Sequence, residues 1–182
     1  MQAPYFSNSL MCYNCSCDWI YAHMSELLGE EKKVGAISIN VADGAAFKNY
    51  DEVLEHIHQK HLADGIVRET YLQALREREA DYPTGILLDG YAVAIPHCDS
   101  QHAVSPAIYI IRLPQEIEVN QADGDEKLWV RLIVNLVVTQ PADQLQLLKA
   151  LFNHLQLADF YHQMLELPAE EAKALFINTI IK

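Results

Sequence analysis

A histidine that directly follows a strand-ending proline is the residue best placed for chemistry in this chain. The apolar run Tyr91 to Ile95 predicts a strand, Pro96 ends it, and His97 comes next. Ligands of α/β proteins bind beyond the ends of strands, so we expect the imidazole of His97 to face a site. A neutral imidazole is nucleophilic near pH 7 because the reference pKa of histidine is ~6.5.

Three other polar side chains supply what transfer of a phosphoryl group requires. The transition state of that reaction is loose and spreads negative charge over the equatorial oxygens, so positioning and charge stabilisation dominate. Arg78 ends a predicted helix that can return over the same edge, and a guanidinium offers paired donors to phosphate oxygens. His102 and Ser105 follow His97 in the same loop. We therefore predict that His97 carries a phosphoryl group, with Arg78 as its counter-charge.

The thiol of Cys98, next to His97, is an alternative nucleophile. Adjacent residues rarely point in the directions that a catalytic dyad needs, and a thiol needs an electropositive environment to ionise. We therefore interpret Cys98 as a small residue that lines the site. A cysteine-dependent hydrolase is the alternative, and it predicts inactivation by thiol reagents and retained function in His97→Ala.

Three cysteines near the N-terminus, Cys12, Cys15 and Cys17, could bind zinc together with His23. Structural zinc sites take four ligands, commonly as two well-separated pairs, so one cluster of this spacing is weak evidence for a metal. We expect no metal here and no cofactor elsewhere in the chain.

Three histidines fall on one predicted helix, at His56, His58 and His61. The last two share a helical face, because residues three positions apart are neighbours on a helix. We interpret the three as part of a solvent-facing side of the helix rather than as a metal site.

Length and composition indicate one folded domain. The chain has 182 residues, of which 51% are hydrophobic, and a net charge of −12. This acidity disfavours nucleic acid and anionic membranes as partners and suits docking to a protein with a basic face. No apolar run reaches the ~20 residues of a membrane span, and no secretory signal opens the chain. We expect a cytoplasmic protein with reduced thiols.

Helix and strand patterns alternate along the chain. Helical spacing predicts helices over residues 51–64, 69–80, 141–157 and 168–180, with a short segment at 158–167. Apolar runs predict strands over 91–95, 107–113 and 128–138, and an edge strand at 117–119. The fold class is α/β, a single domain with a mixed central β-sheet flanked by helices. Residues 1–45 are expected to form a peripheral extension, with a short strand at 34–41, and residues 46–182 the domain.

Four runs of residues around and after His97 form a recognisable pattern. They are Arg78-Glu79 shortly before P-T-G-I at 83–86, A-V-A-I-P-H-C at 92–98, H-A-V-S-P-A-I-Y at 102–109, and Q-L-Q-L-L-K-A-L-F at 144–152. This pattern resembles the phosphohistidine site of enzyme IIA proteins of the bacterial sugar phosphotransferase system, in the fructose/mannitol superfamily. Among them it is most similar to the galactitol-specific enzyme IIA. The resemblance covers residues 47–181 and implies the fructose/mannitol-type enzyme IIA fold.

The resemblance implies a phosphocarrier. The family's phosphorylated histidine falls on His97 and its site arginine on Arg78. His97 would accept a phosphoryl group from the phosphocarrier protein HPr and pass it to a cysteine of the cognate enzyme IIB, in the uptake of a galactitol-type sugar. Any link to the membrane would be indirect, through enzyme IIC.

One position departs from the mannitol-type pattern. Those members carry a second site histidine at the start of the helix after the long strand, where this chain has Gln144. Gln144 can donate a hydrogen bond but cannot become a cation, so His102 is a candidate for the missing imidazole and Ser105 for a further donor. A regulatory enzyme IIA, nitrogen-related or transcription-linked, is the alternative function. It would use the same fold and histidine but signal by docking to other proteins.

Overall fold

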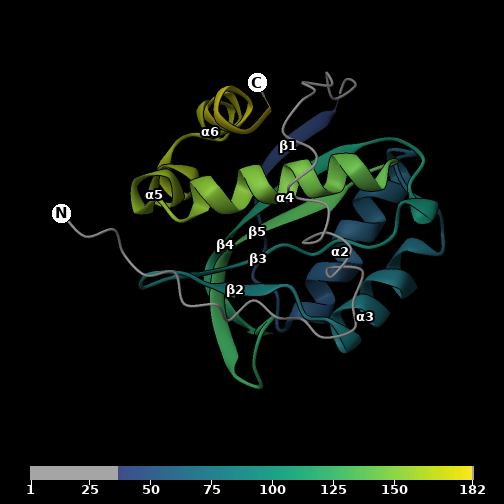
Figure 1. The fold of residues 1–182 in the computed structure, drawn as a ribbon, viewed down its shortest axis with the longest axis horizontal. Coiled ribbons are helices and arrows are strands. Elements are labelled where there is room, and N and C mark those ends of the chain that lie inside the picture. The colour runs from purple at the N-terminus through teal and green to yellow at the C-terminus, as the bar shows by residue number, and fades with distance from the viewer. Residues whose placement is uncertain (1–36, 182) are drawn as a thin grey trace.

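The computed structural model describes residues 37–181, which form alternating helices and strands (Figure 1). The strands are β1 (Ser38–Asp43), β2 (Gly85–Leu87), β3 (Ala92–Ala94), β4 (Ala107–Asn120) and β5 (Lys127–Val137). The helices are α2 (Tyr50–Ala63), α3 (Tyr71–Asp81), α4 (Pro141–Leu155), α5 (Ala158–Glu166) and α6 (Ala169–Phe176), with a 3₁₀ turn η1 (Ser100–His102) and a π-helical end η2 (Ile177–Ile181). None of the described helices is both long and apolar enough to cross a membrane. The predictions for Cys12, Cys15, Cys17 and His23 fall outside the described residues.

The described strands form one mixed sheet, in the order β1-β4-β5-β3-β2. β4 and β5 make a long antiparallel hairpin, β1 runs parallel to β4, and β3 runs parallel to β5. β2 closes the other edge antiparallel to β3. The predicted α/β fold with a mixed central sheet is confirmed.

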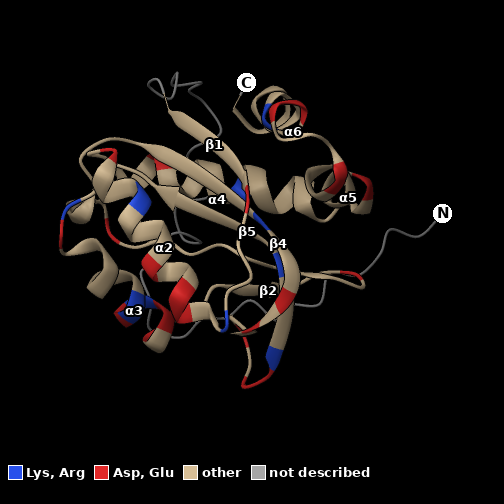
Figure 2. Ribbon diagram, turned by 180° about the vertical axis from the view of Figure 1, so that it is seen from behind, with Lys and Arg blue, Asp and Glu red and all other residues tan. Residues whose placement is uncertain are grey.

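Helices cover both faces of the sheet, and each face has its own hydrophobic core. α2 and α3 lie on one face, whereas α4, α5 and α6 lie on the other (Figures 1 and 2). Along β4, Ile108 and Ile110 belong to the α4–α6 core, and Tyr109 and Ile111 belong to the α2–α3 core. Because strand residues alternate between faces, a strand covered on both sides is apolar at every position, as the sequence runs indicated.

β1 belongs to the sheet although residues 1–45 were expected to be peripheral. It pairs in parallel with β4 along its whole length, and Ile39 and Val41 are buried. The described fold therefore begins before the boundary expected at residue 46. The edge strand predicted at 117–119 is wrong, because these residues continue β4 and pair with β5 beyond an irregularity between Arg112 and Ile117.

The Pro-Thr-Gly turn opens a strand that the sequence did not predict. β2 begins at Gly85, whose backbone lies so close to the β4–β5 hairpin that a Cβ there would stand 2.4 Å from the carbonyl oxygen of Asn120. Glycine alone allows such a close approach. Gly85 therefore lets β2 lie against the hairpin and brings the end of α3 next to β3.

Candidate active site

The backbone holds His97 at the end of β3. The N–H of Ile95 donates to the carbonyl of Thr84 at 3.1 Å, and the carbonyl of Pro96 accepts from the N–H of Leu136 in β5, also at 3.1 Å. Pro96 has no N–H to donate, so the regular ladder ends there. His97 still pairs with Leu136 as an isolated parallel bridge. Two neighbouring strands thus fix the residue where the chain leaves the sheet.

The ring of His97 is held in one tautomer. Its Nδ1–H donates to the carbonyl oxygen of Ile95 at 2.7 Å. Since a carbonyl can only accept, the proton lies on Nδ1 and Nε2 carries the lone pair. Nε2 makes no hydrogen bond to any described residue. Nε2 is therefore the atom that can attack phosphorus.

The site keeps His97 uncharged at neutral pH. Burial lowers the pKa of His97 to about 4, and the positive charge of Arg78 acts in the same direction. The hydrogen bond to Ile95 and the carboxylate of Asp99 oppose this shift without overcoming it. An uncharged imidazole is the form that acts as a nucleophile.

Arg78 reaches the site from the last turn of α3. Its guanidinium lies over the ring of Tyr82, 5.1 Å from the ring centroid, an arrangement that stabilises a cation. Its charge acts on both His97 and Cys98, lowering the pKa of each. Arg78 therefore lies near enough for its charge to act on His97, and its role toward a phosphoryl group stays a prediction.

A buried carboxylate next to Arg78 joins α3 to the sheet. Glu79 is 8% exposed and accepts hydrogen bonds from the N–H of Thr84 at 3.1 Å, from the Thr84 hydroxyl, and from the hydroxyl of Tyr50 at 3.3 Å. Burial is the main cause that raises the pKa of Glu79. Because Thr84 in turn binds Ile95, Glu79 fixes the helix end that carries Arg78 relative to His97. The sequence analysis did not identify this role, and its only signal was the Arg-Glu pair.

Cys98 does not have the properties of a nucleophile. Its thiol is free and buried, and burial, followed by the charge of Asp99, raises its pKa to about 12 despite the opposing effect of Arg78. The thiol is therefore protonated at neutral pH. This supports the interpretation of Cys98 as a lining residue.

His102 and Ser105 make hydrogen bonds to neighbouring segments of the chain. Nδ1 of His102 lies 2.8 Å from the hydroxyl of Thr70, and Nε2 lies 3.2 Å from the amide nitrogen of Gln101. The N–H of Ser105 donates to the carbonyl of Ile66 at 3.2 Å. Among the described residues no hydrogen bond joins His102 or Ser105 to His97. The structure therefore gives neither residue a direct contact with the candidate nucleophile.

Gln144 lies in the first turn of α4, the helix that follows β5. Its N–H donates to the carbonyl of Gln140 at 3.4 Å. Its side chain is half-buried and makes no hydrogen bond to His97 in the described part of the chain. α4 starts four residues after the end of β5, whose Leu136 pairs with His97, so Gln144 stays a candidate by position alone.

The interpretation of the α2 histidines as solvent-facing is wrong for His61, which is 3% exposed. Its Nε2 lies 2.8 Å from Oδ1 of Asn135 in β5, across the α2–α3 core. His56 is half-buried, and its Nε2 lies 3.0 Å from the hydroxyl of Tyr109. Within residues 37–181, no group of three His, Cys, Asp or Glu side chains is arranged to hold a metal ion.

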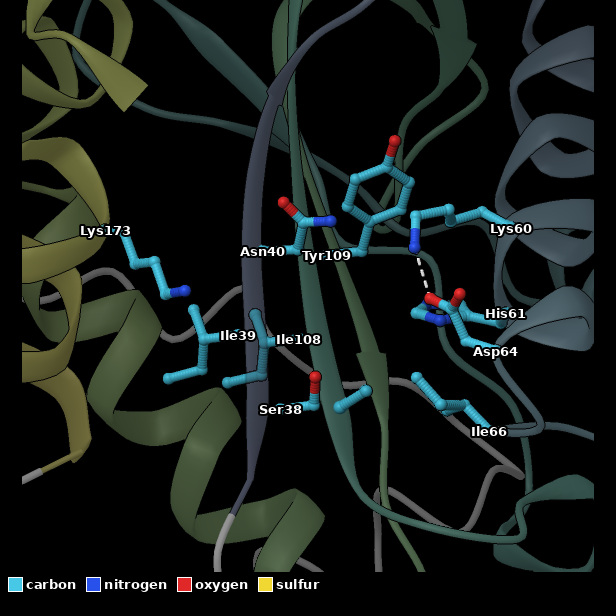
Figure 3. Close-up of a pocket in the computed structure, with 11 residues that line it drawn as sticks. Ser38, Ile39, Asn40, Lys60, His61, Asp64, Ile66, Ile108, Tyr109 and Lys173 are labelled. Atoms are coloured by element: carbon cyan, nitrogen blue, oxygen red, sulfur yellow. Dashed lines mark hydrogen bonds and ion pairs between the residues drawn. The ribbon is translucent and has the colours of Figure 1, made fainter. Parts of the chain in front are cut away.

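A hollow of about 280 Å³ lies away from His97, along the edge strand β1. Figure 3 shows Lys60 and His61 of α2 and the following Asp64 on one side of β1 and Lys173 of α6 on the other, with Lys60 paired to Asp64. His97 does not line this hollow. The candidate nucleophile therefore lies at the end of a strand and outside this hollow, with its side chain only 8% exposed.

Comparison with known sequences gives two agreeing matches. The family "Phosphoenolpyruvate-dependent sugar phosphotransferase system, EIIA 2" matches residues 37–179, which include β1. The galactitol-specific EIIA component of the PTS system of Escherichia coli (strain K12) is 42% identical over 141 residues, covering 78% of this chain and 94% of that protein.

Solved structures share the fold. The complex of enzyme IIAMTL with phosphorylated enzyme IIBMTL from Escherichia coli contains a chain that matches with a TM-score of 0.60 at 18% identity, over 80% of this chain and 98% of that chain. The nitrogen regulatory protein IIA-Ntr from Neisseria meningitidis matches with a TM-score of 0.55 at 20% identity, over 75% of this chain and 90% of that chain. At these identities the likeness shows the fold alone.

Proposed function

This chain belongs to the EIIA 2 family of the phosphoenolpyruvate-dependent sugar phosphotransferase system, and on that premise we propose that His97 is its phosphorylated residue. Members of this family are phosphotransferases that work through a phosphohistidine. The observation that carries the proposal is the hydrogen bond from Nδ1 of His97 to the carbonyl of Ile95. It leaves Nε2 with its lone pair at the end of β3.

The transfer that we propose is a direct exchange between two imidazoles. Nε2 of His97 attacks the phosphorus of a phosphohistidine on HPr and an Nε2–P bond forms. The donor P–N bond breaks with its electron pair returning to the donor ring, which carries a proton on its other nitrogen and so leaves as a neutral imidazole. The proton on Nδ1 of His97 stays in its bond to Ile95. Arg78 stabilises the charge that develops on the equatorial oxygens. A cysteine thiolate of the cognate enzyme IIB then takes the phosphoryl group from His97.

We propose uptake of galactitol or a related sugar alcohol as the process served. This proposal is supported by the 42% identity to the galactitol-specific component. The complex of enzyme IIAMTL with phosphorylated enzyme IIBMTL also contains a chain of the same fold. Contact with the membrane is indirect, through enzyme IIC. The comparisons do not favour the regulatory alternative, because the regulatory protein matches in fold only, at 20% identity.

We place the protein in the cytoplasm, where HPr would meet it. The described cysteine, Cys98, is a free thiol, which fits a reducing compartment. The cysteine-dependent hydrolase is not proposed, since a thiol whose pKa lies at about 12 is not ionised at neutral pH.

The decisive experiment is phosphorylation by purified enzyme I, HPr and phosphoenolpyruvate, followed by intact mass. We expect one acid-labile phosphoryl group on the wild-type chain and none on His97→Gln. Addition of a galactitol-type enzyme IIB should then remove it. Unchanged labelling of His97→Gln would contradict the assignment of the residue, and labelling without transfer to any enzyme IIB would favour the regulatory alternative.

A further inference from the structure

A fully buried asparagine lies in β5, beside the strand that carries His97. Asn135 is 0% exposed. Its amide nitrogen donates to the hydroxyl of Tyr71 at 2.8 Å and to the carbonyl of Pro96 at 2.9 Å, and its Oδ1 lies 2.8 Å from Nε2 of His61. Burial of an amide is unfavourable unless its atoms are bonded, and here both protons of the nitrogen and the oxygen have partners.

The direction of these bonds follows from the partners. The carbonyl of Pro96 can only accept, so the amide nitrogen of Asn135 must point toward it, and the oxygen must point toward His61. His61 therefore donates from Nε2, and its Nδ1 is left without a proton. That atom is buried and unpartnered, and burial is the main cause that lowers the pKa of His61. The orientation of Asn135 is thus determined from both sides.

We propose that Asn135 is a positioning residue for phosphoryl transfer, which holds the Pro96 carbonyl and thereby sets the direction of His97. The proposal rests on the proposed function of His97. The Pro96 carbonyl accepts two hydrogen bonds, from Asn135 and from the N–H of Leu136. Two donors on one oxygen resist rotation of the peptide that joins Pro96 to His97.

Small rotations of this peptide matter because the ring of His97 is tied to the preceding residue. Nδ1 bonds to Ile95, so a tilt of the intervening peptide changes both this bond and the line along which Nε2 attacks. A misplacement of about 1 Å at reacting atoms costs on the order of a hundredfold in rate. Asn135 makes no described contact with His97 itself, so its effect would pass through Pro96.

A purely structural role of Asn135 predicts different behaviour, and three variants separate the two. Asn135→Leu removes both donors. Tyr71→Phe removes one partner of Asn135 but leaves its bond to Pro96. Val134→Ala creates a cavity on the opposite face of the same strand, where Val134 is 1% exposed. The double variant His61→Leu/Asn135→Leu removes both ends of a buried hydrogen bond, which is better tolerated than removal of one.

The measurements are the single-turnover rate of phosphorylation by saturating phospho-HPr and the ¹H–¹⁵N spectrum of the His97 ring, at a temperature where each variant is folded. We expect Asn135→Leu, and the double variant if the single one does not fold, to lose at least tenfold in rate. Their His97 rings should show a mixture of tautomers in place of the Nδ1–H form. Tyr71→Phe and Val134→Ala should stay within threefold of wild type with an unchanged ring spectrum.

Two outcomes would overturn the proposal. One is that the leucine variants show the same His97 ring spectrum as wild type and a phosphorylation rate within threefold of wild type. The other is a rate loss in Val134→Ala as large as in the leucine variants at matched stability. If wild type itself takes no phosphoryl group from phospho-HPr, the proposed function fails, whereas the ring spectra still report whether Asn135 orients His97.

Discussion

The two faces of the sheet bury different kinds of side chain. The core between the sheet and α4–α6 is built mainly from aliphatic and aromatic residues such as Ile110, Leu151 and Phe176, and its buried Arg112 donates to the carbonyl of Leu167. The core between the sheet and α2–α3 also contains hydrogen-bonded polar groups, among them His61 and Asn135. These polar groups lie behind the strand end that carries the candidate nucleophile. We infer that one face mainly stabilises the fold, while the other also directs the chemistry.

The largest effect on the rate of phosphorylation should come from removing a positive charge on the α2–α3 side, that of Arg78. Arg78→Gln should slow phosphorylation by on the order of 10² to 10³-fold, because a donor aimed at transition-state charge is lost, with little change in melting temperature. Arg76→Gln, one half-turn away on α3, is the matched control and should leave the rate unchanged. The single-turnover assay with phospho-HPr measures both. Equal rates of phosphorylation in the two variants would show that Arg78 does not take part in the transfer.

A change in the apolar core should act on stability alone. Leu151 is 0% exposed in α4, and Leu151→Ala should lower the free energy of unfolding by about 2 to 5 kcal/mol through lost burial and the cavity created. Denaturant unfolding measures this loss. The rate of phosphorylation of the folded fraction should stay within twofold of wild type. A large rate loss would show that the division between the two faces is wrong.

The buried ring of His97 should make the fold sensitive to acid. Its pKa is lowered to about 4, whereas an unfolded chain protonates histidine near ~6.5. Between pH ~6.5 and about 4 the unfolded state binds the proton and the folded state does not. The free energy of unfolding therefore keeps its full value above pH ~6.5 and decreases as the pH falls toward about 4. The loss should reach about 3 kcal/mol at most.

His97→Gln lacks this titration and is the control. We expect the free energy of unfolding of wild type to fall more steeply than that of the variant as pH is lowered through this window, by chemical denaturation at several pH values. The other histidines are present in both proteins and cancel. Parallel curves would contradict the shifted pKa of His97.

The smallest effect on the free energy of unfolding should come from substituting a charged residue on the surface of the α2–α3 layer (Figure 2). Arg76 donates to Asp51 and Glu55, each at 2.6 Å, but all three side chains are at least one-third exposed. Exposed ion pairs contribute roughly 0 to 1 kcal/mol. Arg76→Gln should therefore change the free energy of unfolding by less than about 1 kcal/mol, and the difference should shrink further in high salt. A larger loss would indicate a coupled network.

Apolar runs and spacing predicted the fold class because a sheet covered on both faces leaves continuous hydrophobic strands in the sequence. The nearness of Arg78 to His97, seen in its effect on the pKa of His97, could also be predicted, since a proline that ends a strand and a helix that returns over it are local signals. The position of Cys98 next to His97, together with the electropositive setting that a thiolate needs, predicted it as a lining residue, which its raised pKa supports.

The polar core could not be predicted in the same way. His61 bonds to a residue 74 positions away in the chain, and no local pattern reveals such a partner. β2 was missed because its pairing depends on the missing Cβ of Gly85 against Asn120. β1 was assigned to a peripheral segment because its place in the sheet is decided by the distant β4. Each of these features depends on tertiary contacts rather than on local propensity.

The buried amide of Asn135 has a consequence for how the sheet assembles. A slip of β5 by one residue against its neighbours would turn this amide into the aliphatic core under α4 and would turn Val134 and Leu136 toward the hydroxyl of Tyr71. Both changes are unfavourable, since an unbonded amide would be buried and three partners would lose their bonds. One asparagine thus distinguishes the correct strand alignment from its nearest competitor, and only the correct alignment places the candidate nucleophile His97 at the end of β3.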